Sequence, residues 1–408
     1  MSVSYGNLST YPPTQCGLAT FSKALVDSLS SAEDVVQVVS VVDAAGDPTS
    51  EEVCHEWVRG SSGSAAAAAV LNELDVAIIQ HEYGIFAGRD GADVLDVVRA
   101  LWVPTIVVLH TVLETPSARQ RSILEELARN AVTVVTMTHT GQRRLAAHYS
   151  VDPAKIRVVP HGAVDNRGVP KPMSAHPVIL TWGLLGEGKG IEWAIDAMAD
   201  LADLRPRPGY QVVGQTHPRV LEQHGERYRD RLIDQAAALR VDVEFDSRYL
   251  ASADLRRLVR QADVILLPYD SLEQVTSGVL IEAIAAGKPV VATAFPHARE
   301  LLASGAGIVV PRQDPAAIAA ALRRVLTEPG LAAGMAAEAR RIAPALLWPA
   351  VAGQYRDIAA DALGDALDGT LGDALDGTLG AALDGTLEAA LGDALADTLT
   401  ADNARITA

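Results

Sequence analysis

The chain has 408 residues, of which 49% are apolar and 21% charged, a composition typical of a globular protein with two or three domains. Its formal net charge is −17, with about half of it in residues 361–408, which argues against a basic surface for nucleic acid. Two cysteines exclude a disulfide framework, and without a signal peptide or a long apolar run we expect a cytoplasmic protein with no membrane span.

Short runs of Val, Ile and Leu recur along the chain, with helical stretches between them. The runs are continuous rather than alternating, which is typical of strands buried on both faces of a parallel sheet. Separated by helices, they predict βαβ units. The twelve predicted strands lie at 3–9, 35–43, 75–80, 105–110, 132–137, 156–160, 178–183, 210–215, 243–247, 264–268, 289–294 and 307–311.

Twelve strands are too many for one doubly wound domain, so we divide the chain. A segment rich in Gly and Pro, residues 161–177, lacks periodicity and indicates a connection between two sheets. The division that follows is an N-terminal domain at 1–162, a linker at 163–175, a C-terminal domain at 176–345, a closing helix at 346–362, and an acidic repeat of low complexity at 363–408.

The most distinctive stretch runs from residue 273 to residue 293. Thr276, Ser277 and Gly278 precede an apolar helical segment, and the start of such a helix offers backbone N–H groups and the positive end of the dipole to an anion. Glu282 falls inside this apolar segment. Its carboxylate therefore needs partners, which either ligand hydroxyl groups or neighbouring backbone donors would provide.

Two further features lie at the ends of predicted strands, where ligands bind in open parallel sheets. After the strand at 178–183, a glycine-rich turn holds Gly188 and Lys189, and such a turn lets backbone and an ammonium group approach a phosphate. His110 ends the strand at 105–110, where a structural histidine and a functional one are both consistent with the pattern.

Several common catalytic motifs do not occur. The sequence has no G-x-S-x-G elbow, no H-E-x-x-H and no phosphate-binding P-loop, and its first turn lacks G-x-G-x-x-G. No group of His, Cys and carboxylate residues has spacing typical of a metal site. We therefore expect no cofactor and no metal, so a leaving phosphate would have to be stabilised by cations and helix termini.

Taken together, these segments resemble the retaining glycosyltransferases of family 4, which have the GT-B fold. The resemblance implies two Rossmann-like, doubly wound parallel-sheet domains that face a central cleft. It covers about residues 5–360, and its most specific part is the stretch at 273–293. The other matching segments are YPPTQCGLATF, VVLHT, IRVVPHGAVD, LLGEGKGIEWAIDA and ADVILLPYD.

The resemblance also implies roles for single residues. Lys189 matches the lysine that holds the donor diphosphate, and His110 matches the histidine near the reacting sugar. Glu282 matches the ribose-binding glutamate, and Gly17 matches a glycine near the diphosphate and the acceptor. Backbone N–H groups in the matching loop contact the donor, and that loop is Thr276, Ser277 and Gly278 here.

Two positions depart from the family pattern. Leu184 stands where the family has an arginine of the diphosphate clamp, and we expect Arg248 to compensate for it. The family also has two glutamates with seven residues between them, and Gln274 stands in place of the first. A glutamine can hydrogen-bond to a sugar hydroxyl but cannot stabilise positive charge as a carboxylate does.

The resulting hypothesis is a retaining, metal-independent hexosyltransferase that uses a nucleoside-diphosphate sugar. We expect the donor on the C-terminal domain and an acceptor hydroxyl on the N-terminal domain, near Gly17, His81, Tyr83 and Asp90. Two alternatives remain open: a sugar-nucleotide epimerase of the same fold, and a non-catalytic protein that binds sugar nucleotides or assembles with others. The donor base, the sugar, the acceptor and the oligomeric state are not predicted.

Overall fold

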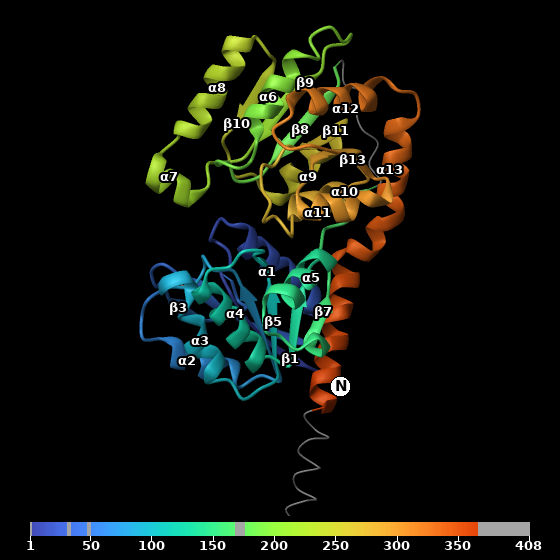
Figure 1. Cartoon of the computed structure of the whole chain (residues 1–408). Helices are drawn as coiled ribbons and strands as arrows, with labels where there is room; N and C mark the ends of the chain where they lie inside the picture. Colours follow the sequence, from blue (N-terminus) through green and yellow to red (C-terminus); the bar gives the residue numbers. More distant parts are fainter. Residues whose placement is uncertain (1, 31–33, 47–49, 168–175, 366–408) are drawn as a thin grey trace, which may run out of the picture. The chain divides into compact units, whose positions relative to one another are not determined.

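A computed structural model describes residues 2–30, 34–46, 50–167 and 176–365, and Figure 1 labels most of its helices and strands. The expected linker at 163–175 is therefore described only to residue 167, and the acidic tail only to residue 365. The remainder of both lies outside the described residues. Both sheets of the protein belong to one compact unit, Met1–Ile358.

The first sheet is wholly parallel and has seven strands in the order β3-β2-β1-β4-β5-β6-β7. Its strands are β1 (Ser4–Ser9), β2 (Val35–Val42), β3 (Val53–Val58), β4 (Val76–His81), β5 (Thr105–Leu109), β6 (Thr133–Thr136) and β7 (Ile156–Val158). The helices between them are α1 (Gly17–Leu29), α2 (Ser64–Leu71), α3 (Val94–Arg99), α4 (Ala118–Asn130) and α5 (His139–His148).

The second sheet is also parallel and has six strands in the order β10-β9-β8-β11-β12-β13. Its strands are β8 (Val178–Trp182), β9 (Gly209–Val213), β10 (Val243–Asp246), β11 (Val264–Leu267), β12 (Val290–Thr293) and β13 (Gly307–Val310). Its helices are α6 (Ile191–Ala199), α7 (Pro218–His224), α8 (Arg227–Leu239), α9 (Ser252–Gln261), α10 (Gly278–Ala285), α11 (Pro296–Leu301), α12 (Pro315–Thr327) and α13 (Leu331–Ile342).

Hydrophobic burial on both faces holds the strands of the second sheet in place. Alternate residues of β8 and β11, such as Ile179 and Leu266, pack against α6, α8 and α12. Their neighbours Leu180 and Ile265 belong to a separate cluster with α10 and α13. Because each strand faces apolar helices on both sides, its sequence is a continuous apolar run.

The twelve predicted strands are all present, and the structure adds β3 to the first sheet. This strand pairs only with β2, so it lies at the edge of the sheet and is only partly buried. Its sequence, VCHEWV, mixes polar and apolar residues and gives no apolar run. The predicted fold class, two doubly wound parallel-sheet domains, is confirmed, whereas the exact domain boundaries stay a prediction.

A final helix begins at residue 348 and continues to residue 365, where the described residues end. None of the helices within the described ranges is long and apolar enough to cross a membrane.

Candidate functional site

Strand order defines one switch point in each sheet. In the first sheet the chain moves outward from β1 in both directions, to β2 on one side and β4 on the other. In the second sheet β8 holds the same position between β9 and β11. At a switch point, the loops after the two neighbouring strands run in opposite directions. Their divergence at the carboxyl ends of the strands leaves room for a ligand. The loops after β1, β8 and β11 are therefore the natural places for a site.

The turn after β8 fixes Lys189 against the end of β11. Gly188 has a φ of +86° and its carbonyl accepts a 2.9 Å hydrogen bond from the Asp270 N–H. Gly190 has a φ of +66°, and a Cβ there would lie 1.9 Å from the Pro268 carbonyl oxygen. Only glycine fits so close an approach in a left-handed conformation. The backbone therefore determines where the Lys189 side chain starts.

The ammonium group of Lys189 lies 4.5 Å from the centre of the Tyr269 ring, a cation–π contact. Burial lowers the pKa of this ammonium group from its ordinary value. The hydroxyl of Tyr269 is in turn hydrogen-bonded to the Ser277 side chain. Tyr269 therefore connects the lysine to the residue immediately before α10, and Lys189 does not extend into open solvent.

Helix α10 starts as predicted, with Ser277 as its N-cap. The Ser277 hydroxyl accepts from the Leu280 N–H at 3.3 Å, and the Ser277 N–H donates to Nδ1 of His297 at 2.8 Å. A Cβ at Gly278 would lie 2.8 Å from Nε2 of His161, so that imidazole lies directly against the start of the helix. His161 was not predicted as a site residue; its only signal was its position as the first residue of the Gly- and Pro-rich segment 161–177.

His161 links the start of α10 to His110 through aromatic contacts. The ring of Phe21, on α1, makes edge contacts with His161 at 5.0 Å and with His110 at 4.8 Å between centroids. Burial lowers the pKa of His110 to about 3, with smaller contributions from His161 and His81. The pKa of His161 is lowered to about 4 by burial. Both imidazoles are therefore neutral at physiological pH.

Glu282 lies in α10, one turn beyond the helix start. Burial raises the pKa of its carboxyl group to about 7, while a hydrogen bond from the Trp182 side chain and the charge of Arg256 act in the opposite direction. Trp182 ends β8. The carboxylate thus has a structural partner, a side-chain indole rather than the ligand hydroxyl or backbone donor expected from the sequence, and a titration near neutral pH.

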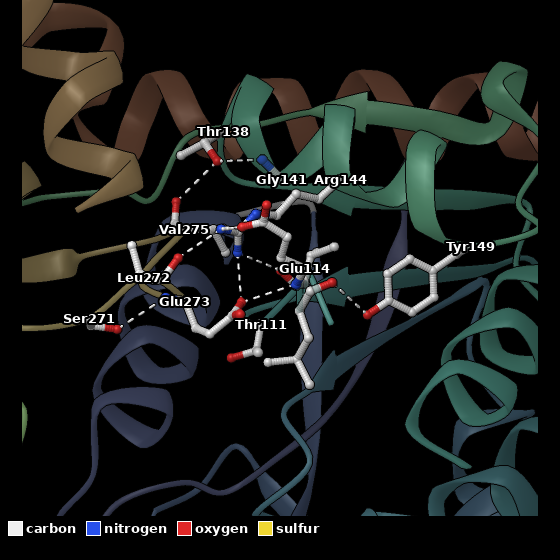
Figure 2. Close-up of polar contacts among 12 residues, drawn as sticks. Thr111, Glu114, Thr138, Gly141, Arg144, Tyr149, Ser271, Leu272, Glu273 and Val275 are labelled. Atoms are coloured by element: carbon white, nitrogen blue, oxygen red, sulfur yellow. Dashed lines mark hydrogen bonds and ion pairs between the residues drawn. The ribbon is translucent and has the colours of Figure 1, made fainter. Parts of the chain in front are cut away.

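The loop before α10 is tied to the first sheet by Arg144 (Figure 2). This guanidinium, on α5, donates to the Glu273 carboxylate and the Leu272 carbonyl, at 2.8 and 2.7 Å. It also donates to Glu114 at 2.8 Å and to the Val112 carbonyl at 3.2 Å, both in the loop after β5. Gln274 instead donates within its own loop, to the Thr276 carbonyl. This network could not be predicted from the sequence, because nothing in the spacing connects Arg144 with Glu273.

Three of the predicted residues make none of these hydrogen bonds or ring contacts. Arg248 makes a two-pronged ion pair with Asp246, and its side chain is 76% exposed. Gly17, the first residue of α1, has open space where a Cβ would stand. His81 is fully buried, and neither of its ring nitrogens has a hydrogen-bond partner among the residues that the structure describes. An acceptor would therefore meet Tyr83 or Asp90 rather than the His81 ring.

A cavity of about 450 Å³ contains none of the predicted site residues. Phe21 contacts both His110 and His161, His161 lies against Gly278, and Tyr269 lies against Lys189. Within the described ranges, no three His, Cys or carboxylate side chains are placed to hold a metal ion. The cavity is lined by Glu114, Thr140, Arg143, Arg144, Leu272, Ala294, Pro296, Arg299 and Glu300.

The paired parallel sheets define a protein of the GT-B class. The fold matches Anabaena Alr3699/HepE, solved with UDP and glucose, with a TM-score of 0.70 and 19% identity over 88% of this chain and 100% of that one. It matches the sucrose-phosphate synthase of Thermosynechococcus elongatus with the same TM-score, identity and coverage. Models of two families cover most of the chain: "Glycosyltransferase Family 4" matches residues 17–167 and "Glycosyl transferases group 1" residues 176–328. The chain belongs to glycosyltransferase family 4.

Curated relatives agree with this family. The chain is 31% identical to the D-inositol 3-phosphate glycosyltransferase of Geodermatophilus obscurus, over 60% of this chain. That match spans only 58% of the relative's own length. The enzyme of the same name from Corynebacterium aurimucosum is 26% identical over 81% of this chain and 82% of its own.

Proposed function

We propose that this protein transfers a hexose from a nucleoside-diphosphate sugar to an acceptor hydroxyl, with retention of anomeric configuration and without a metal ion. One observation carries the proposal: Tyr269 joins the Lys189 ammonium group to the residue that caps α10. An ammonium group and the start of a helix, close together at the carboxyl edge of a parallel sheet, form a site suited to a diphosphate.

Each of the other residues has a part in this reaction. The Lys189 ammonium and the N–H groups at the start of α10 hold the diphosphate, and the Glu282 carboxylate accepts hydrogen bonds from the ribose hydroxyls. His110 lies at the sugar. The acceptor lies on the first sheet, near Gly17, Tyr83 and Asp90, and exclusion of water from the closed site prevents hydrolysis of the donor.

Retention follows if the acceptor attacks from the face that the leaving group departs from. The bond between the anomeric carbon and the diphosphate oxygen breaks, and its electron pair leaves with the oxygen. The acceptor oxygen then bonds to the anomeric carbon, and its proton passes to the departing phosphate oxygen. The diphosphate therefore serves as the base, and the protein contributes binding, orientation and charge stabilisation.

The two departures from the family pattern affect the charge of the site. With Leu184 in place of an arginine, Lys189 carries more of the diphosphate charge, and Arg248 is already paired with Asp246. Gln274 presents a neutral amide, and the adjacent carboxylate of Glu273 is bound to Arg144. We therefore propose that positive charge on the sugar is stabilised mainly by the departing diphosphate itself.

A donor screen with the full chain tests the proposal. UDP-, GDP- and ADP-sugars are added in turn. A true donor binds only the folded state, so it stabilises that state by about 2.7 kcal/mol at a hundredfold excess over Kd and raises the melting temperature. UDP-sugars are the first to test, because HepE was solved with UDP and glucose. Phosphorylated polyols are the first acceptors, because the curated relatives are named for D-inositol 3-phosphate.

Lys189→Ala then asks whether the site is correct. We expect it to lower transfer at least a hundredfold while the melting temperature of the free protein changes little. Lys23→Ala, which removes an exposed lysine on α1 paired with Asp27, serves as the control and should transfer normally. Normal transfer by Lys189→Ala would falsify the assignment, and an epimerised donor without acceptor would favour the epimerase. An NMR spectrum of the product reports the anomeric configuration.

A further inference from the structure

Three polar side chains form a diagonal row across the first sheet. Asn7 lies on β1, Gln80 on β4, and His110 immediately follows β5. In the strand register Asn7 is opposite Ile78 and Gln80 is opposite Val108. Gln80 therefore lies two residues beyond Ile78, the residue opposite Asn7. His110 likewise lies two residues beyond Val108, the residue opposite Gln80, so the row approaches the carboxyl edge of the sheet from one strand to the next. Because side chains alternate along a strand, all three lie on one face of the sheet.

Gln80, the middle member of the row, is hydrogen-bonded to both of the others. The Gln80 amide nitrogen donates to the Asn7 side-chain oxygen at 3.2 Å. Its amide oxygen is 2.9 Å from Nε2 of His110. In this orientation of the amide its oxygen can only accept, so Nε2 of the imidazole carries the proton. The neutral ring has one ring proton, so Nδ1 has a lone pair.

Burial limits the arrangements that compete with this one. Asn7 and Gln80 are buried, with exposed fractions of 1% and 0%. Turning the Gln80 amide alone would put its oxygen against the Asn7 oxygen, and an unpaired buried polar group costs about 1–3 kcal/mol. The Asn7 amide nitrogen is itself buried without a partner among the described residues, so the competing arrangement turns both amides and places the proton on Nδ1 of His110. The ring of His110 is half-buried, and Phe21 packs against it edge-on. Among the described residues Nδ1 of His110 has no hydrogen-bond partner, so it is the nitrogen available to a ligand.

We propose that Gln80, held by Asn7, is a positioning residue that fixes His110 with its proton on Nε2 and directs the Nδ1 lone pair toward a hydroxyl of the bound sugar. The direction toward a sugar rests on the function proposed above, whereas the tautomer does not. This role explains why a glutamine and an asparagine are fully buried within the sheet. A glutamate at position 80 would also accept from Nε2, but its charge would favour the imidazolium, which has no lone pair.

NMR spectroscopy tests the tautomer on the full chain without requiring activity. The protein is labelled with nitrogen-15 in histidine, and the signals of His110 are assigned by their loss in His110→Asn. We expect a protonated Nε2 and an unprotonated Nδ1 throughout the neutral pH range. A proton on Nδ1, or an average of the two tautomers, would overturn the proposal even if the protein proved to be an active glycosyltransferase.

Two substitutions at Gln80 test the positioning role. In Gln80→Leu the tautomers average and kcat falls about 10- to 100-fold, the scale of a misplaced catalytic contact, while nucleotide affinity is unchanged. In Gln80→Glu the carboxylate raises the pKa of His110, so kcat acquires a new decline toward acid pH that the wild type lacks. The other titratable groups that act on this ring are the imidazoles of His81 and His161, which stay neutral.

The chain contains a matched control. On α5 the Gln142 amide oxygen is 3.3 Å from Nδ1 of His139, an exposed glutamine–histidine pair. Gln142→Glu repeats the same charge change there and should leave kcat and its pH profile unaltered. If Gln80→Glu retains the wild-type pH profile, or if Gln80→Leu changes nucleotide affinity as much as kcat, Gln80 has only a structural role. If the wild type transfers no sugar at all, the proposed function fails while the tautomer measurement still stands.

Discussion

The Arg144 guanidinium and the Glu273 carboxylate form an ion pair of 2.8 Å between a helix that covers the first sheet and a loop of the second. The Arg144 side chain is only 9% exposed and also donates to Glu114 and two backbone carbonyls (Figure 2). The loop after His110 and the loop before α10 therefore share one buried cation. The Thr138 hydroxyl adds a hydrogen bond to the Val275 carbonyl, at 3.0 Å. We infer that this network holds the donor loop against the first sheet.

Arg144→Leu should release that loop. We expect the free energy of unfolding to fall by about 3 kcal/mol, the lower end of the range for breaking a buried ion pair, because Glu114 and Glu273 are partly exposed and can hydrate. The KM for the donor should rise because Gln274 and Thr276 lose their fixed position. Denaturant unfolding and steady-state kinetics measure both effects. Arg143→Leu removes the exposed neighbouring arginine and should change neither, whereas equal effects of the two variants would contradict the network's role.

Much of this architecture could be predicted because strands buried on both faces show themselves as apolar runs. The glycine-rich turn and the start of α10 were predictable for a similar reason, since Gly188 and Ser277 serve local backbone needs. The edge strand β3 and the ion pair of Arg144 were not predictable. An edge strand has no apolar run, and an ion pair between residues 129 positions apart depends on how the two sheets pack.

His81 should make the folded protein sensitive to acid. Burial lowers the pKa of this imidazole from 6.5 to about 4 in the folded protein, so the unfolded chain binds a proton that the folded one does not. Its stabilising effect is complete above about pH 6.5 and is lost as the pH falls toward 4, at up to about 1.4 kcal/mol per pH unit. The buried His297 acts in the same direction, with a pKa lowered to about 4. The raised pKa of Glu282 acts in the opposite direction.

Replacement of His81 isolates its part. In His81→Leu the free energy of unfolding should change less steeply with pH below pH 6.5, by the slope that corresponds to about one bound proton. Denaturant titration at several pH values measures this slope. His139→Leu removes an exposed histidine and should leave the dependence as in the wild type. The same slope in His81→Leu as in the wild type would mean that His81 is not the titrating group.

Glu282 should couple nucleotide binding to proton release. Its carboxyl group has a pKa raised to about 7 by burial, so a large fraction is protonated at neutral pH. Ribose hydroxyls donate to the charged form, so binding lowers this pKa and affinity rises with pH, up to about tenfold per unit below pH 7. Calorimetry in buffers with different heats of ionisation counts the protons released when the nucleoside diphosphate binds.

Glu282→Gln should weaken nucleotide binding by about 1.5–3 kcal/mol, the usual contribution of a hydrogen bond to a charged group, and should abolish the proton release. Glu244→Gln, on the exposed side of β10, is the matched control and should bind as the wild type does. Proton release that persists in Glu282→Gln would assign the titration to another group.

Gly17 offers a test that separates ligand contact from folding. The residue begins α1, its φ is not in the left-handed region, and no atom lies within 4 Å of where a Cβ would stand. Gly17→Ala should therefore leave the free energy of unfolding unchanged or raise it slightly, because alanine restricts the unfolded chain. If the diphosphate or the acceptor approaches this helix start, the added methyl group occupies the space that the ligand needs. We then expect the KM for one substrate to rise at least tenfold with the melting temperature preserved.

The measurement pairs kinetics for both substrates with thermal unfolding, and Gly334→Ala, another glycine with open space around it, is the control. Wild-type kinetics in Gly17→Ala would show that neither substrate needs the open space at this helix start, and the loop would then not belong to the site.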